Sequence, residues 1–353
     1  MRKSFKRMLI AAAAGLFSAA AVSAGAFAAN LNGAGGTAIY PVLQVWAQKY
    51  QQQTGIQVNY QAIGSGGGIK AIESKTVDFA NSDKPLVHSD IVANNLVQFP
   101  QVVISIVPVV NLPGITPGQM VLDGKTLADI YLGKVSKWND PEIKALNPNV
   151  KLPGLSIIVV HRSDGSGTTF NFVNYLGKVS PEWESTVDKG GPGDTSVTWP
   201  ADSMGRGNAG KGNAGVAGAV ASVIGSIGYV EYAYVKQNNM IYTDMINSAG
   251  KRVSPSMAAF QTAAGNANFT GIQDFYLILT NQPGDASWPI TAATYMLMRA
   301  DYDAARNQNV LKFLDWCLKS GQADAEQLDY VPLPANVVSQ IEDSWKTTLK
   351  VSP

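Results

Sequence analysis

The residues that could do chemistry gather in three short segments rich in glycine and hydroxyl side chains. These segments are NGAGGTAIYP (32–41), IGSGGGIKAI (63–72) and DGSGTTFNF (164–172), and each lies where a helix is expected to begin. The first amides of a helix are unpaired and its dipole is positive there, so such a turn can bind an anion. Glycine allows close backbone approach, and Ser or Thr caps the helix and adds a hydroxyl donor. One such turn usually indicates only a cap, whereas three in one chain favour an anion site.

Three charged residues bear on such a site. Arg162 lies two residues before the third segment's Asp164, and its planar guanidinium can hold two anion oxygens at once. Asp164 can pair with Arg162 and orient it, although the same spacing fits a surface ion pair of little energetic weight. Asp83 repels a fully ionised anion but can accept a hydrogen bond from a protonated one. It equally fits a helix cap or an Asx turn before Pro85.

Other motifs argue against nucleotide binding, metal binding and catalysis. GRGNAGK (205–211) matches two nucleotide-binding patterns, but Gly212 replaces the Ser or Thr that binds Mg²⁺ and no buried strand precedes it, so we expect a flexible loop near a helix start. His88 and His161 have no metal-ligand spacing. Ser65 comes nearest to a nucleophile, but it lacks the G-x-S-x-G pattern. We therefore expect no metal, no cofactor and no catalytic residue.

The N-terminus has the layout of an export signal. A basic start (MRKSFKR), an apolar stretch and the small-x-small sequence AFA predict cleavage after residue 28. Residues 1–28 contain four basic and no acidic residues, so the mature chain has 23 basic and 26 acidic residues and a formal charge of −3. This charge argues against nucleic acid as a partner. Cys317 is the one cysteine; we expect it to be a buried thiol, and we expect no lipid anchor.

Strand-like and helix-like stretches alternate along the rest of the chain. The apolar runs at 56–63, 102–112 and 155–160 predict strands, and amphipathic stretches at 40–55 and 168–179 predict helices. This alternation predicts α/β layers with helices flanking sheets. At 353 residues the chain is longer than one core usually supports, so we expect two lobes.

Several segments, in order, resemble the periplasmic phosphate-binding proteins of Pst-type ABC importers. They are GAGGTAIYP, GIQVNYQAIGSGGG, VDFANSDKPL, LDGKTLADIYLGKVSKWND, DGSGTTF, IGYVEYAY and WPIT, which together run from about residue 31 nearly to the C-terminus. The resemblance implies an α/β protein with a two-lobed type II periplasmic binding protein fold and a ligand cleft between the lobes. Residues 29–105 and 284–353 would form lobe I, and residues 106–283 would form lobe II.

The resemblance also implies a set of phosphate-binding residues. Asp83 would accept the phosphate proton, Arg162 would be the cationic clamp oriented by Asp164, and the remaining residues would donate from hydroxyl and amide groups. The implied set is Thr37, Ala38, Ser65, Asp83, Arg162, Ser166, Gly167 and Thr168. This chain departs from the family pattern at Ala38, Gly66 and Lys84; we expect an amide donor to survive at Ala38 and Gly66, and Lys84 to alter the local potential or the affinity.

The function that the resemblance implies is high-affinity capture of inorganic phosphate in the periplasm and its delivery to an inner-membrane ABC permease. We expect a monomer without enzymatic activity. Three alternatives stay open: a binding protein for another tetrahedral oxyanion such as arsenate, sulfate or a phosphonate; a secreted phosphatase or esterase that uses Ser65 or Ser166; and an adhesin or scaffold on the same fold.

Overall fold

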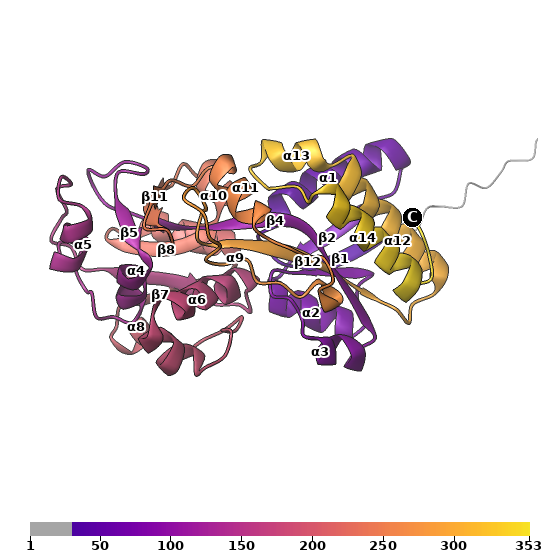
Figure 1. Cartoon of the computed structure of the whole chain (residues 1–353), viewed down its shortest axis with the longest axis horizontal. Helices are drawn as coiled ribbons and strands as arrows, with labels where there is room; N and C mark the ends of the chain where they lie inside the picture. Colours follow the sequence, from indigo (N-terminus) through magenta and orange to yellow (C-terminus); the bar gives the residue numbers. More distant parts are fainter. Residues whose placement is uncertain (1–29) are drawn as a thin grey trace, which may run out of the picture.

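Strand β4 (Leu96–Val110) runs through the centre of the molecule and joins its two lobes (Figure 1). The computed structural model describes residues 30–353, so the predicted signal peptide at 1–28 lies outside the described residues. No helix between residues 30 and 353 combines the length and the apolar character needed to cross a bilayer.

One long sheet extends through both lobes in the order β2 (Val58–Ala62), β1 (Leu31–Gly35), β3 (Phe79–Ser82), β12 (Thr291–Arg299), β4, β8 (Ser226–Glu231), β6 (Ile158–Arg162) and β7 (Gly207–Gly210). Residues 96–105 of β4 pair with β12, and from Ile106 onward β4 pairs with β8. The two lobes are named here by their strands: the β1 lobe contains β1, β2, β3 and β12, and the β6 lobe contains β6, β7 and β8. The division of the chain near residues 105 and 284 stays a prediction.

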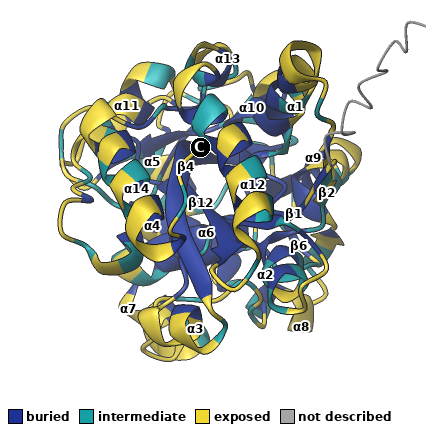
Figure 2. Ribbon diagram, turned by 90° about the vertical axis from the view of Figure 1, so that its right-hand side faces the viewer, coloured by how far each residue is buried: buried dark blue, intermediate teal, exposed yellow. Residues whose placement is uncertain are grey.

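The strands of the long sheet and of a small second sheet (order β11-β10-β5) vary from two to fifteen residues. The remaining strands are β5 Val121–Asp123, β9 Ile241–Tyr242, which pairs with β4, β10 Asp244–Ile246 and β11 Arg252–Val253. All residues of β4 and β12 are buried, because helices and loops cover both faces of these central strands (Figure 2).

Helices surround the long sheet and turn their exposed faces outward (Figure 2). Their bounds are α1 Tyr40–Thr54, α2 Ser65–Glu73, α3 His88–Ala93, α4 Gly124–Tyr131, α5 Pro141–Leu146, α6 Gly167–Val179, α7 Pro181–Trp183, α8 Pro200–Ser203, α9 Gly212–Ser222, α10 Tyr232–Gln237, α11 Met257–Gly265, α12 Ala304–Lys319, α13 Gln322–Gln327 and α14 Ala335–Thr348. A π-helical turn follows α7 at Glu184–Asp188, and a 3₁₀ turn lies at Gln273–Phe275.

Local sequence explains where several helices begin and end. In α1, Pro41 occupies the first turn, where its missing N–H costs nothing, and Gly55 ends the helix with a φ of 77°. The apolar side of α1, including Val42 and Trp46, is buried against the sheet. Asp123 caps α4 by accepting a hydrogen bond from the amide of Thr126 at 2.7 Å.

The sequence-based α/β prediction is confirmed, although several bounds differ; the strand predicted at 102–112, for example, lies at Leu96–Val110. The strand predicted at 155–160 lies at Ile158–Arg162, so Arg162 belongs to the strand end rather than to the loop after it. The loop predicted at 205–211 is wrong at Gly207–Gly210, where strand β7 pairs with β6, whereas the helix start expected beside it is confirmed by α9 (Gly212–Ser222). Glycine permits this close packing, since a Cβ at Gly210 would lie 2.4 Å from the backbone of Gly215.

Large aromatic side chains form most of the interior around the sheet. Fully buried tryptophans occur in both lobes, for example Trp46 and Trp345 in the β1 lobe and Trp138 and Trp183 in the β6 lobe. Cys317 on α12 is buried, as predicted, and burial raises the pKa of its thiol well above the ordinary value.

Candidate functional site

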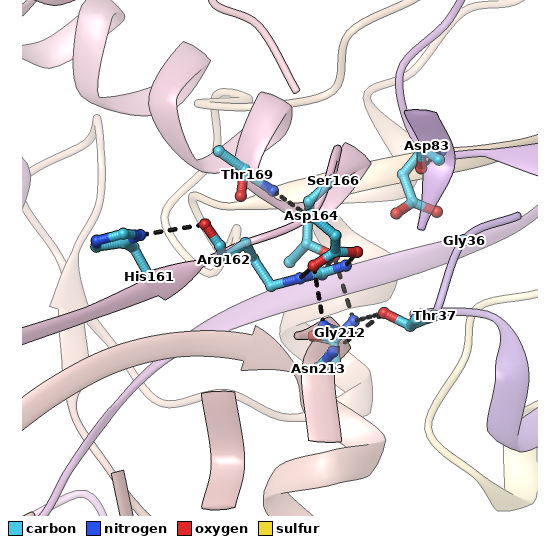
Figure 3. Close-up of polar contacts among 12 residues, drawn as sticks. Gly36, Thr37, Asp83, His161, Arg162, Asp164, Ser166, Thr169, Gly212 and Asn213 are labelled. Carbon is cyan, nitrogen blue, oxygen red and sulfur yellow. Dashed lines mark hydrogen bonds and ion pairs between the residues drawn. The ribbon is translucent and has the colours of Figure 1, made fainter. Parts of the chain in front are cut away.

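The three glycine- and hydroxyl-rich turns meet where the β1 lobe contacts the β6 lobe. Thr37 lies just before α1, Ser65 is the first residue of α2, and Ser166 caps α6. All eight residues of the predicted site are buried. Figure 3 shows Thr37, Asp83, Arg162 and Ser166 grouped around one small region.

Hydrogen bonds between the lobes show that this arrangement is closed. The amide of Gly66 donates to the carbonyl oxygen of Gly165 at 2.9 Å. The side-chain amide of Asn171, on α6, donates to the carbonyl oxygen of Asp83 at 2.7 Å. At Gly167 there is no room for a side chain, because a Cβ would lie 2.5 Å from Ser65 Oγ and 2.6 Å from Asp83 Cβ. This glycine lets the start of α6 approach the opposite lobe.

Arg162 is the one permanently charged cation of the predicted set, and Asp164 fixes its guanidinium. Nε donates to Asp164 Oδ1 at 2.8 Å and Nη2 donates to Asp164 Oδ2 at 2.5 Å, a bidentate pair. The surface-pair alternative is wrong, because the side chains of Arg162 and Asp164 are only 2% and 12% exposed. Burial by itself raises the pKa of Asp164, but the hydrogen bonds and charge of Arg162 outweigh it, so the pKa lies below its ordinary value.

The hydroxyl oxygens of Ser65, Ser166 and Thr37 all accept hydrogen bonds from N–H groups. Ser65 Oγ accepts from the amide of Asp83 at 3.1 Å, and Ser166 Oγ accepts from the amide of Thr169 at 3.0 Å. Thr37 Oγ1 likewise accepts from N–H groups, those of Asn213, at 2.8 Å and 3.1 Å. An N–H group only donates, so each of these hydroxyl hydrogens stays free to be donated elsewhere. Such a set of neutral donors beside a guanidinium suits an anion.

Asp83 is the buried carboxylate of the site. It is 1% exposed and accepts a hydrogen bond from Thr294 Oγ1 at 2.8 Å. Asp83 is neither a helix cap nor part of an Asx turn, because its carboxylate accepts from Thr294 on β12, 211 residues away in sequence. Burial raises the pKa of Asp83 to about 6, against the opposing effects of Thr294 and Arg162. An aspartate in this environment can accept a hydrogen bond from a protonated anion.

Two details of the predicted donor set need correction. The amide of Ser166 donates to the carbonyl oxygen of Thr195 at 2.9 Å, so Ser166 offers only its hydroxyl to a ligand. Gly66 was expected to keep an amide donor for the anion, but its amide bonds to Gly165 across the lobes. A serine at position 66 would be crowded, because a Cβ there would lie 3.1 Å from Gly165 Cα.

Two residues near the site, at the start of α9 just after the segment expected to be a loop, were missed by the sequence reasoning. The amide of Gly212, which has a φ of 68°, donates to Asp164 Oδ1 at 2.9 Å. Asn213 is fully buried and contacts Thr37 (Figure 3). The available signal was the glycine-rich start of α9, since the first amides of a helix seek acceptors. Thr294 was also missed, and nothing local in sequence marks it.

His161 and Lys84 lie outside the donor set. His161 Nε2 lies 2.9 Å from Asp202 Oδ1, and its ring stacks on Trp199 with centroids 5.0 Å apart. Lys84 forms an ion pair with Asp194 at 2.9 Å between the lobes, and both side chains are partly exposed. Among residues 30–353, no group of three or more His, Cys, Asp and Glu side chains is arranged to hold a metal ion.

Comparisons with known proteins give a consistent result. A family model described as "PBP superfamily domain" matches residues 20–320. The chain is 50% identical over 322 residues to the phosphate-binding protein PstS of Xylella fastidiosa (strain Temecula1), covering 91% of this chain and 86% of the relative. It is also 50% identical to PstS of Haemophilus influenzae, covering 91% and 94% of the two chains.

Solved structures with lower sequence identity share the fold. A high-affinity periplasmic phosphate-binding protein (PfluDING), solved at subatomic resolution with phosphate bound, aligns with a TM-score of 0.71 at 20% identity. The alignment covers 90% of this chain and 94% of the other. The predicted two-lobed type II periplasmic binding protein fold is thereby confirmed.

Proposed function

This chain belongs to the PBP superfamily and, within it, to the PstS phosphate-binding proteins, and from this premise we propose that it captures inorganic phosphate for delivery to an ABC-type permease. The phosphate would bind between the lobes at Thr37, Ala38, Ser65, Asp83, Arg162, Ser166, Gly167 and Thr168. Asp164 supports this site by orienting the guanidinium of Arg162.

The observation that carries this proposal is a single buried carboxylate, that of Asp83, in a site otherwise made of donors. Hydrogen phosphate has oxygens that accept from the hydroxyls, amides and Arg162, and it also has one O–H that can donate to Asp83. Sulfate has no proton at neutral pH, so its oxygens would face the ionised carboxylate with no hydrogen bond between them. The site therefore favours a protonated tetrahedral anion.

The remaining parts of the proposal concern the wider role of the protein. The chain would act in the periplasm after removal of residues 1–28, as a monomer that docks transiently on the inner-membrane permease when closed. It would bind phosphate without turning it over, because the hydroxyl oxygens of Ser65 and Ser166 accept hydrogen bonds from backbone amides, and within residues 30–353 neither hydroxyl bonds to a side chain that could act as a base.

The direct test is isothermal titration of the phosphate-free protein with phosphate, sulfate, arsenate and methylphosphonate. We expect tight phosphate binding at about pH 6 and about pH 8, since both protonation states that phosphate adopts there keep a proton for Asp83. Sulfate binding as tight as phosphate binding would overturn the role of Asp83. Tighter binding of a phosphonate or arsenate would assign the site to that oxyanion instead.

A matched pair of arginine variants tests the clamp. Arg162→Ala removes the guanidinium from the site and should reduce phosphate affinity more than about 100-fold, because it deletes several charge-assisted hydrogen bonds. Arg299→Ala is the control, because Arg299 forms the same bidentate pair with Asp301, at 2.7 Å and 2.9 Å, at the end of β12. The control should keep wild-type affinity.

The two other function classes are tested with the same preparations. A secreted phosphatase or esterase would hydrolyse a chromogenic phosphate ester, and we expect no turnover above the uncatalysed rate. An adhesin or scaffold would tolerate Arg162→Ala without loss of function, whereas phosphate import in cells should fail with this variant.

A further inference from the structure

Asn213 uses every hydrogen-bonding group of its side chain, and one of these bonds crosses to Thr37 in the β1 lobe. Its Nδ2 donates to Thr37 Oγ1 at 2.8 Å and to Thr168 Oγ1 at 3.3 Å. Its Oδ1 accepts from the amide of Glu231 at 2.9 Å, which assigns the oxygen and nitrogen of the amide without ambiguity. The backbone amide of Asn213 also donates to Thr37 Oγ1, at 3.1 Å. The side chain is fully buried.

These contacts determine which way the Thr37 hydroxyl can point. A hydroxyl oxygen accepts two hydrogen bonds and donates one. Both acceptor positions of Thr37 Oγ1 are taken by N–H groups of Asn213, and neither of these groups can accept in return. Figure 3 shows the Thr37 oxygen joined to Asn213 by dashed lines, and the one hydrogen of Thr37 must therefore point away from Asn213.

The Thr168 hydroxyl oxygen also accepts from two donors, at longer distances. Its Oγ1 accepts from Asn213 Nδ2 at 3.3 Å and from Arg162 Nη1 at 3.4 Å. Both partners are donors, so the Thr168 hydrogen is also left for another acceptor. The side-chain amide of Asn213 thus determines that both hydroxyls, one from each lobe, accept from it and keep their own hydrogens for another acceptor.

We infer that Asn213 is a positioning residue that turns the hydroxyl hydrogens of Thr37 and Thr168 toward the bound anion as the lobes close. The inference rests on the proposed phosphate site, and it adds a residue that does not itself belong to the predicted ligand set. Asn213 lies in the β6 lobe and Thr37 in the β1 lobe, so the hydrogen bonds between these two residues exist only in the closed arrangement, whereas the bond to Thr168 lies within the β6 lobe. A preorganised donor spends less entropy on binding than a freely rotating hydroxyl.

A double-mutant cycle in phosphate affinity tests this inference. Asn213→Ala should weaken binding about 10- to 100-fold, because a Thr37 hydroxyl that is no longer held in place loses its hydrogen bond to the charged anion. In a Thr37→Val background the hydroxyl is already absent, so the same substitution should cost at least about 5-fold less. Equal losses in both backgrounds, or no loss from Asn213→Ala alone, would overturn the inference.

Two further variants separate positioning from stability. Asn147→Ala is the matched control, because Asn147 is also buried in the β6 lobe and bonds to the carbonyl oxygens of Val121 and Ile143 away from the site. It should lower stability and leave affinity unchanged. Asn213→Leu is the second test should Asn213→Ala fold poorly, since it is close in size to Asn, removes the donors and adds no charge beside the anion. Its loss of affinity should also shrink in the Thr37→Val background, and an unchanged loss would count against the inference.

Stopped-flow kinetics give an independent readout. Because Asn213 meets Thr37 only after closure, its substitution should raise the dissociation rate of phosphate and leave the association rate nearly unchanged. An effect confined to the association rate would overturn the inference. Absence of phosphate binding by the wild-type protein would instead refute the proposed function, so the two failures are distinguishable.

Discussion

Replacing Asp83 by Asn should stabilise the phosphate-free protein at neutral pH. Burial raises the pKa of Asp83 to about 6, while an aspartate in the unfolded chain has a pKa of about 3.9. Folding therefore opposes ionisation of Asp83, and the native state binds more protons than the unfolded state between these two values. The burial of Asp83 therefore does not lower the free energy of unfolding below about pH 4. It lowers this free energy increasingly as the pH rises, and by its full amount above about pH 6.

The magnitude follows from the size of the shift. A difference of about two pKa units corresponds to about 3 kcal/mol, so Asp83→Asn should gain up to that amount near pH 7.5. Near pH 4.5 the wild-type carboxyl is mostly protonated in the native state, and the gain should fall to about 1 kcal/mol. The gain is an upper value, because opening of the lobes without phosphate lessens the burial of Asp83, and because Asn must still satisfy its own amide hydrogens beside Thr294 and Arg162.

Urea denaturation of phosphate-free protein at the two pH values measures this difference. Comparing variants at the same pH cancels the titration of all other groups, provided the m-values agree. Asp90→Asn, at an exposed position on α3, controls for the loss of one negative charge. A gain that does not change with pH, or a destabilised Asp83→Asn protein at pH 7.5, would refute the assignment of Asp83 as a carboxylate penalised by burial.

Three other substitutions have clear expected outcomes. Arg162→Lys should bind phosphate at least about 10-fold more weakly in titration, because a point charge cannot hold Asp164 in a bidentate pair and face the anion as well; unchanged affinity would contradict this. Gly167→Ala should impair closure, since its methyl group would meet Ser65 Oγ at 2.5 Å, and a lower affinity together with a larger radius of gyration in phosphate by X-ray scattering would show it; wild-type values would mean that α6 shifts freely. Lys84→Ala should change affinity less than about 5-fold, because the pair with Asp194 is partly exposed; a larger loss would show that Lys84 acts on the ligand through its charge.

Much of the candidate site was predictable from the sequence because its parts are local. A glycine and a hydroxyl residue at a helix start predict a turn with free donors whatever surrounds it, and all three such turns lie at helix starts. Arg162 and Asp164 are two residues apart, so the end of one strand brings them together without help from the rest of the fold. Alternating apolar segments likewise predicted the α/β layers.

The tertiary structure alone decided which of these local features act together. Asn213 and Thr37 are 176 residues apart, and Asp83 and Thr294 are 211 apart, so no periodicity or spacing connects them. The glycine-rich segment at 205–211 looked irregular because its apolar content is low, yet β7 forms there by pairing with β6. Whether a hydroxyl donates or accepts, and how deeply it is buried, depends on the neighbours that folding brings to it. The sequence alone therefore predicted the donor residues but not Asn213, which orients the Thr37 hydroxyl from the other lobe.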